Sequence, residues 1–155
     1  MRVTYESLPA EASVLIYPGG RKFYPKELPV VIERMDEFCL SFEGIDLCYE
    51  IKYDRFLVFL VSEETPLDLD NQNILVDFVQ QLEKEFDITL LDKVNVCFKQ
   101  GEYVQLKEIV DFKKLVKSKG VSKKTIVFDL MINNKYEYET FFEAPAGDSW
   151  VAHFF

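Results

Sequence analysis

The heptapeptide "RFLVFLV", residues 55–61, contains six apolar side chains in succession. In an extended strand, successive side chains point to opposite faces, so alternate residues from Phe56 lie on one face and alternate residues from Leu57 lie on the other. A strand that is apolar on both faces is typically buried on both sides. The heptapeptide therefore predicts a central strand in a sheet that has a covering layer on each face.

The elements around this strand follow the order βαββαβ. The spacing of apolar residues predicts a strand at 13–17, a helix from near Pro25 to before Gly44, a strand at 47–53, a helix over 74–86 with candidate caps in "LDLDNQN", and a strand at 94–99. The last strand is expected to turn Val94, Val96 and Phe98 inward and Cys97 outward. This order is typical of a ferredoxin-like plait, so we predict an α+β fold with a ferredoxin-like plait core over residues 1–100.

A two-layer plait leaves one face of its sheet bare, and residues 101–155 are predicted to form a C-terminal α/β extension that packs on this core. The chain is interpreted as a single domain, 1–155. Gly101 is expected to turn a hairpin, and "NNKYEYETFF", residues 133–142, is compatible with a strand or with a helix capped by Asn134. We expect Trp150, Phe154 and Phe155 to pack across the second sheet face or a neighbouring groove. A second subunit is the alternative cover.

The composition is that of an ordinary globular protein. Of 155 residues, 48% are apolar and 29% are charged, and the net charge is −9. The chain has no signal-peptide pattern and no long apolar run, so we predict a cytoplasmic protein without a membrane partner. The negative charge makes a nucleic-acid partner unlikely, although residues 107–124 carry a local excess of lysine. The three cysteines fit neither a disulfide framework nor a metal motif and are predicted to be reduced and buried.

Several segments resemble a family of small uncharacterised bacterial proteins of about 150 residues that are automatically labelled "ABC transporter ATPase". The resemblance rests on "LIYPGGRKF", "YEIKYDRFLV", "FVQQLEKEFDITLLDKVNVCFKQGEYV", "DFKKLVKSKGVSKKTIVF" and "APAGDSW". An ATP-binding cassette needs a glycine-rich loop followed by Lys and Ser or Thr, and this chain has no Gly-Lys pair. The sequence therefore predicts no ATPase activity and no cofactor.

Four charged residues are candidates for an anion-binding site. Arg21 and Lys22 follow a Gly-Gly turn, which could present backbone amides and two cations to an anion. Glu50 and Arg55 flank the predicted hairpin, and all four match the family pattern. A plain turn with solvated charges and a cross-strand ion pair are the alternative interpretations.

The remaining candidates have structural alternatives. An aromatic recognition surface is possible, although core packing is the usual role of rings at this density; it would comprise Tyr136, Tyr138, Phe141, Phe142 and Trp150. His153 is the sole histidine, which excludes a histidine cluster within one chain. The acidic residues Glu63, Glu64, Asp68 and Asp70 match no calcium-loop spacing, so no metal site is predicted.

The sequence as a whole favours a small, cytoplasmic, non-catalytic binding or interaction module. Its partner is an unknown protein or small molecule, and a homodimer is possible. The predicted ligand contacts are Arg21, Lys22, Glu50, Arg55 and Trp150. The alternative is a small anion-binding protein or enzyme that uses the four charged residues, which requires those four to converge on one pocket.

Overall fold

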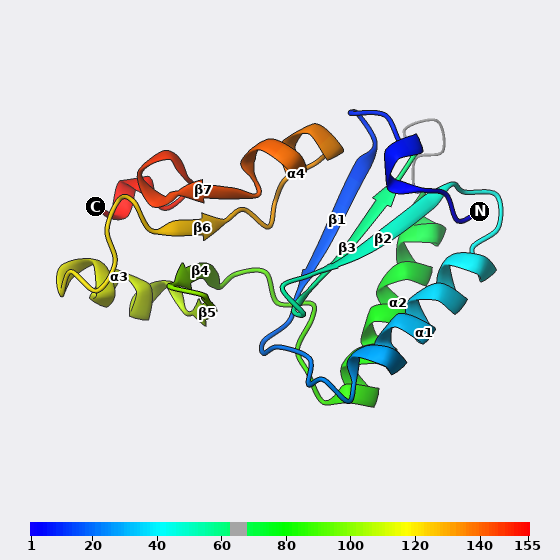
Figure 1. Cartoon of the computed structure of the whole chain (residues 1–155), viewed down its shortest axis with the longest axis horizontal. Coiled ribbons are helices and arrows are strands. Elements are labelled where there is room, and N and C mark those ends of the chain that lie inside the picture. Colours follow the sequence, from blue (N-terminus) through cyan, green and yellow to red (C-terminus); the bar gives the residue numbers. More distant parts are fainter. Residues whose placement is uncertain (63–67) are drawn as a thin grey trace.

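Two sheets lie side by side in an elongated molecule, each with its own helical cover (Figure 1). The computed structural model describes residues 1–62 and 68–155. Within these residues the strands form a three-stranded and a four-stranded antiparallel sheet, so the α+β class is confirmed. Over the same residues, no helix combines the length and the apolar character needed to cross a membrane.

The first sheet has the heptapeptide strand at its centre. β3 (Phe56–Val61) lies between β1 (Ser13–Pro18) and β2 (Leu47–Lys52). α1 (Leu28–Ser41) and α2 (Leu69–Phe86) cover one face, where their side chains form one hydrophobic cluster with Leu57, Phe59 and Val61. All six residues of β3 are buried, as its two apolar faces predict.

The ends of α2 are set by local chemistry that the sequence indicates. The side chain of Asp68 accepts a hydrogen bond of 2.8 Å from the backbone N–H of Asn71, which caps the first turn. The helix ends at Phe86, and the capping residue Asp87 adopts a left-handed conformation with φ of 50°. The cap expected within "LDLDNQN" is therefore Asp68.

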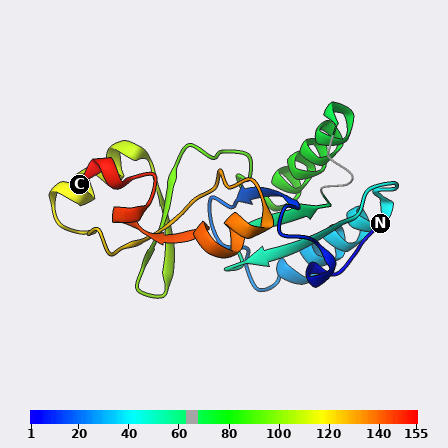
Figure 2. The same cartoon turned by 90° about the horizontal axis from the view of Figure 1, so that it is seen from above.

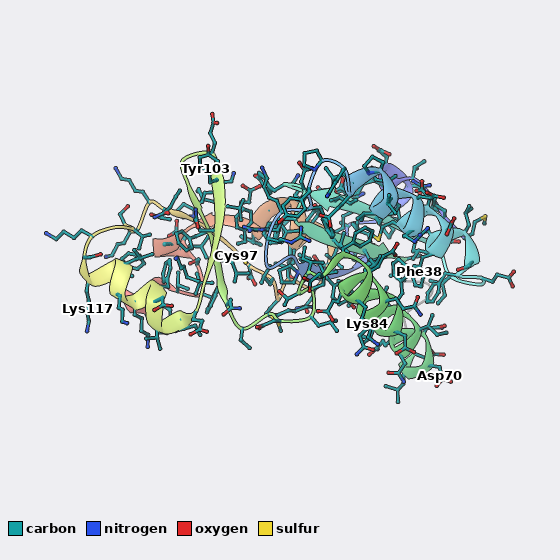
Figure 3. The ribbon with its side chains drawn as sticks, turned by 90° about the horizontal axis from the view of Figure 1, so that it is seen from below. Phe38, Asp70, Lys84, Cys97, Tyr103 and Lys117 are labelled. Atoms are coloured by element: carbon teal, nitrogen blue, oxygen red, sulfur yellow. The ribbon has the colours of Figure 1, made fainter. Side chains whose placement is uncertain are left out.

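The second sheet contains the later strands in the order β5-β4-β6-β7. Figure 2 shows this part of the molecule at the opposite end from α1 and α2. Its strands are β4 (Val96–Gln100), β5 (Tyr103–Lys107), β6 (Ile126–Phe128) and β7 (Glu143–Pro145). α3 (Ile109–Lys117) packs on it through Phe112, and the remaining helices are η1 (Tyr5–Ser7), α4 (Lys135–Phe141), η2 (Ala146–Asp148) and η3 (Ala152–Phe154). Gly101, with φ of 64°, turns the β4–β5 hairpin, whose tip carries the exposed Tyr103 (Figure 3).

The predicted plait is not confirmed, because its fourth strand pairs elsewhere. The order β1-β3-β2 matches three strands of a plait, but β4 joins β5 and β6 instead of the edge of β1. Residues of the C-terminal part occupy that edge, where the backbone N–H of Val14 donates to Asn133 O over 3.0 Å. The second sheet therefore begins before residue 100, the predicted boundary of the core.

The interpretation of Cys97 as outward-facing is wrong. Val96 and Phe98 are buried in the cluster beneath α3, while Cys97 is buried in the cluster against the first sheet. β4 thus has an apolar layer on each face, as a strand between two layers must. Figure 3 shows Cys97 in the middle of the molecule.

The bare face of the first sheet is covered by the C-terminal part of the same chain, as expected. Val58 and Leu60 on this face share a cluster with the segment 128–142, whose members there are Phe128, Leu130, Ile132, Tyr138 and Phe142. The covering residues differ from the expected ones. Phe154 and Phe155 pack instead on Phe112 of α3, beside the second sheet, at ring distances of 6.3 and 6.5 Å.

Residues 135–141 form the helix α4, which resolves the choice between strand and helix. Asn134 Oδ1 accepts from the backbone N–H of Glu137 over 2.8 Å, and Glu137 Oε2 accepts from the N–H of Asn133 over 2.9 Å. These bonds satisfy amide groups at the start of the helix. Lys135 Nζ then donates to Tyr5 O and Leu8 O, which joins α4 to the N-terminal segment.

Candidate functional site

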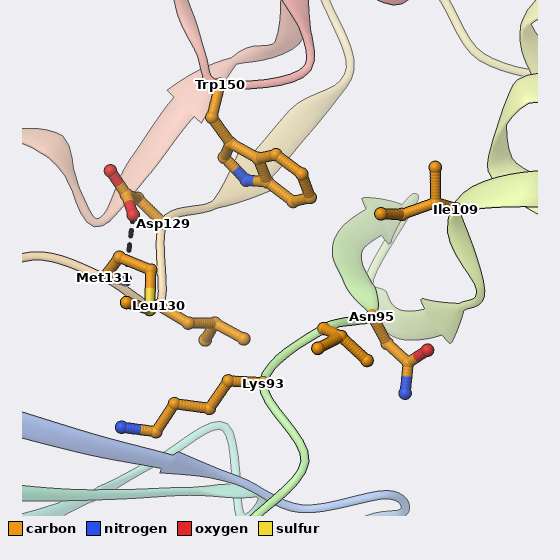
Figure 4. A pocket seen from close by; sticks show the side chains of 8 residues that line it. Lys93, Asn95, Ile109, Asp129, Leu130, Met131 and Trp150 are labelled. Carbon is orange, nitrogen blue, oxygen red and sulfur yellow. Dashed lines mark hydrogen bonds between the residues drawn. The ribbon is translucent and has the colours of Figure 1, made fainter.

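A largely apolar groove opens between the segment that leads into β4 and the segment that follows β6 (Figure 4). Its cavity volume is about 410 Å³. Figure 4 shows the indole ring of Trp150 over one side and the Lys93 stem on the other. The lining residues are Lys93, Val94, Asn95, Ile109, Asp129, Leu130, Met131 and Trp150.

The groove exists because β4 and β6 separate. The two strands pair at Phe98 and Val127, and continuing this register would place Val94 opposite Met131. Each of the two segments instead departs from this register in a turn formed by an aspartate. Asp92 Oδ1 accepts from the N–H of Val94 over 3.1 Å, and Asp129 Oδ1 accepts from the N–H of Met131 over 2.9 Å. These matched turns satisfy amides that the sheet would otherwise use and hold the two walls apart.

The groove presents apolar side chains to solvent. Val94 and Met131 are each 71% exposed, and Trp150 is 40% exposed. The indole Nε1–H of Trp150 donates to Phe128 O over 3.4 Å, and the ring contacts Phe154 edge to face. Trp150 is thus anchored by its polar edge while its face remains available, an arrangement common in binding sites.

Charge around the groove is mainly negative. A second hollow of about 300 Å³ adjoins the first, shares Val94 and Ile109 with it, and includes the side chains of Asp92 and Glu108. Lys93, the one lysine among the described residues that line the groove, places its Nζ 4.8 Å from the ring centroid of Tyr17, and burial lowers its pKa. The site therefore combines an apolar groove with an adjoining pair of carboxylates.

Trp150 is the predicted contact residue that the structure places in this groove. Sequence reasoning missed Met131 and the two aspartates, and the prediction that Val94 turns inward is wrong, because Val94 is 71% exposed. The Asp-x-apolar pattern before Val94 and before Met131 is a turn signal that could have indicated them. The separation of β4 from β6 is a tertiary feature without a sequence signal.

The four charged candidates do not form one pocket among the described residues. Arg21 donates to Glu27 Oε1 at 2.9 Å and to Phe86 O at 2.6 Å, so it ties the start of α1 to the end of α2. The hydrogen bond from Arg21 lowers the pKa of Glu27. Lys22, the next residue, is exposed.

The adjacent pair Arg21 and Lys22 gives a matched test of a structural role. We expect Arg21→Ala to lower the free energy of unfolding by about 1–2 kcal/mol, because it removes the side-chain donor to Phe86 O and leaves Glu27 with the N–H of Tyr24 alone. Lys22→Ala is expected to change it by less than about 0.5 kcal/mol. Urea denaturation of both variants measures the difference, and equal effects would contradict the assigned role of Arg21.

Glu50 and Arg55 also have separate partners. Glu50 Oε2 accepts from the phenol of Tyr138 over 2.6 Å, whereas Arg55 Nη1 donates to Val104 O. The backbone of Arg55 does lie near the Gly-Gly turn, since its carbonyl accepts from the N–H of Gly19 over 2.9 Å. A Cβ at Gly19 would come within 2.7 Å of that carbonyl, so the turn requires glycine there. The guanidinium groups nevertheless point to different segments.

The aromatic residues of α4 divide into two groups. Tyr138 and Phe142 are buried against the first sheet, and Tyr136 and Phe141 are exposed and contact each other edge to face. No cluster of metal-binding side chains occurs among the described residues. Asp68 is used as the cap of α2, and Glu63 and Glu64 lie outside the described residues.

Part of the chain is similar to Ribonuclease Y of Acetivibrio thermocellus. The two sequences are 31% identical over 88 residues, which make up 57% of this chain but 17% of the ribonuclease. No family model matches the chain, and no solved structure matches it. A match of this extent carries no activity from the ribonuclease to this chain.

Proposed function

We propose that this protein is a small, non-catalytic, cytoplasmic binding module and that the Trp150 groove is its binding site. Its ligand is a short partner segment with a large apolar side chain next to a Lys or Arg. The observation that carries this proposal is the exposure of Val94, Met131 and Trp150 around one cavity beside two carboxylates. Exposed apolar groups gathered in this way mark interaction sites on protein surfaces.

The size of the groove supports a side chain as the ligand. Ligand pockets commonly have volumes of about 300–1,000 Å³. At about 410 Å³ this groove lies at the lower end of that range. An apolar anchor would stack on Trp150, and a neighbouring cation would lie towards Asp92 and Glu108.

Negative charge favours a cationic partner over nucleic acid. The chain has a net charge of −9, and carboxylates adjoin the groove. Phosphate groups would be repelled there, whereas a Lys or Arg would be attracted. The partial similarity to Ribonuclease Y therefore does not lead us to propose RNA as the ligand, and membership of the family labelled "ABC transporter ATPase" stays a prediction.

Anion binding by Arg21, Lys22, Glu50 and Arg55 is the weaker proposal. Arg21 and Arg55 both use their guanidinium groups on backbone carbonyls of other segments. Glu50 is occupied by Tyr138. These contacts support roles in packing rather than in holding a common ligand.

Trp150 is the sole tryptophan, so its fluorescence reports directly on the groove. We expect a hexapeptide that alternates Leu and Lys to shift the Trp150 emission in a saturable manner. The same peptide with Glu in place of Lys is expected to bind far more weakly. Absence of a saturable shift with either peptide, or equal binding of both, would overturn the proposal.

A matched pair of variants localises the binding. Met131 and Leu69 are almost equally exposed, at 71% and 70%, but Leu69 lies on α2 outside the groove. Met131→Ser is expected to weaken peptide binding about tenfold or more, since contact with a large apolar side chain contributes about 1.5–3 kcal/mol. Leu69→Ser is expected to leave the affinity unchanged. Loss of binding in both variants would show that the peptide adheres to apolar surface without a specific site.

A further inference from the structure

The outer edge of β2 is only partly covered. β2 lies at the edge of the first sheet, and its other neighbour is the N-terminal segment. The N–H of Leu47 donates to Met1 O over 3.0 Å, and Leu47 O accepts from the N–H of Val3 over 2.9 Å. Among the described residues, this segment forms a bridge with β2 at Leu47 alone and then continues into η1.

Beyond Leu47, alternate residues of β2 also direct their backbone N–H and C=O groups towards the outer edge. In an antiparallel strand, the N–H and C=O of one residue point to the same side, and this side alternates along the strand. Leu47 directs its groups away from β3, so Tyr49 and Ile51 do so as well, while Glu50 and Lys52 bond to β3. β2 therefore offers the N–H and C=O groups of Tyr49 and Ile51 to an additional strand.

Space for such a strand exists along this edge. Two hollows of about 630 and 490 Å³ share Arg2, Tyr49 and Glu50 and follow the edge of β2. The exposed apolar side chains Ile32 and Leu40 of α1 line them on the helical side. This surface is distinct from the Trp150 groove.

We propose that a second copy of this chain docks here, with its β2 antiparallel to the first and the two-fold axis at Ile51. A two-fold dimer uses the same surface on both subunits, so the edge must be complementary to itself. In this register Ile51 exchanges two backbone hydrogen bonds with Ile51 of the partner subunit. Two three-stranded sheets then form one continuous sheet.

The residues of β2 select this register over its neighbours. An axis at Tyr49 would place Ile51 of the partner subunit opposite Leu47, where Met1 and Val3 already bind. An axis at Glu50 would place two like carboxylates directly opposite each other, which is destabilising. The axis at Ile51 avoids both problems.

Charge complementarity supports the axis at Ile51. It places Glu50 opposite Lys52 of the partner subunit, and the symmetric pair forms on the other side of the axis. These are non-hydrogen-bonded pairs, in which the side chains approach most closely. Glu50 uses Oε2 for Tyr138, and no described residue donates to its other carboxylate oxygen. Two favourable cross-strand ion pairs therefore flank the axis.

The first experiment measures self-association by sedimentation equilibrium in moderate salt, because two copies with a charge of −9 repel each other at low ionic strength. We expect a reversible dimer. Ile51→Pro removes the outward N–H but no bond to β3, so it is expected to weaken dimerisation tenfold or more and to leave the circular dichroism spectrum unchanged. Ile51→Val is the matched control and is expected to dimerise like the wild type.

The second experiment tests the register through charge. Lys52→Glu and Glu50→Lys each place like charges opposite each other and are expected to weaken dimerisation when studied alone. An equimolar mixture of the two is expected to restore it, because every cross-strand pair becomes Glu with Lys. Circular dichroism checks that Glu50→Lys, which loses the Tyr138 contact, still folds; if it does not, Ile51→Pro and Lys52→Glu decide the question.

A wild-type protein that stays monomeric at its highest soluble concentration would overturn the proposal. It would do so even if this edge binds a strand from another protein. A dimer that is unaffected by both Ile51→Pro and Lys52→Glu would also overturn it. Failure of the groove peptides to bind has no bearing on this result, because the two surfaces share no residue.

Discussion

Replacing Phe128 by alanine is expected to lower the free energy of unfolding by about 3–5 kcal/mol, among the largest effects of a single core substitution. Phe128 belongs to β6 of the second sheet, but its fully buried ring lies in the cluster that covers the first sheet. It contacts Tyr53, Phe56 and Phe142 at ring distances of 5.5, 4.9 and 5.1 Å. The substitution leaves a cavity between the two sheets.

Phe141→Ala is the control for this experiment, since Phe141 is a half-exposed phenylalanine next to Phe142 in the sequence. It is expected to change stability by about 0.5 kcal/mol or less. Chemical denaturation gives both values, and hydrogen exchange of Phe128→Ala should show faster opening in β1 and β6 together. A loss below about 1 kcal/mol for Phe128→Ala would mean that the two sheets do not depend on this contact.

Raising the pH above 9 is expected to destabilise the protein steeply. Burial raises the pKa of Cys39 and Cys97 to about 12 and that of Cys48 to about 11, from an ordinary value of 9.0. Above pH 9 the unfolded chain therefore releases thiol protons that the folded chain retains. Stability is fully present below pH 9 and is lost as the pH rises towards the folded pKa values, by about 1.4 kcal/mol per pH unit for each thiol.

The thiols supply most of the slope between pH 9 and pH 10. Tyrosine phenols add to it near pH 10, because burial likewise raises the pKa of Tyr5, Tyr17, Tyr49, Tyr53 and Tyr138 above that of the unfolded chain. Urea denaturation at several pH values should show a loss of about 3 kcal/mol between pH 9 and pH 10 from the three thiols, because each is half ionised in the unfolded chain at pH 9. A variant with all three cysteines replaced by alanine is expected to lose most of this slope, even though its stability at pH 7 is lower. A wild-type slope near zero would show that the thiols ionise in the folded protein.

The two proposed binding surfaces, the Trp150 groove and the β2 edge, lie on different sheets. The Trp150 groove belongs to the second sheet and the β2 edge to the first. Figure 1 shows β2 on the side of the first sheet that faces away from β6 and β7. A dimer through β2 would therefore leave both grooves open, so one assembly could hold two partner segments.

Local sequence determined much of the secondary structure. The heptapeptide predicted a central buried strand, and apolar spacing predicted α1 and α2. The alternative of a helix capped by Asn134 is confirmed by its hydrogen bond with Glu137. These features depend on side-chain periodicity and on contacts between residues close in sequence, which a single segment contains in full.

The strand at 94–99 shows where such reasoning stops. Its alternation of apolar and polar residues indicated a strand with one buried face, and Cys97 was assigned to the outward face. A small thiol is compatible with a buried or an exposed position. Cys97 is buried because the first sheet packs against that side of β4. Likewise, Trp150 could be identified as a candidate contact, but its groove required the separation of β4 from β6.

The amino-acid sequence by itself determined that this protein has a doubly buried strand, two amphipathic helices on one face of its sheet, and a second face that needs a cover from the C-terminal part or from a second subunit. Tertiary structure alone decided which residues provide that cover, which sheet receives β4, and where Val94, Met131 and Trp150 meet. The reason is physical: periodicity fixes how much apolar surface each element must bury, whereas the choice of partner depends on packing between segments far apart in the chain.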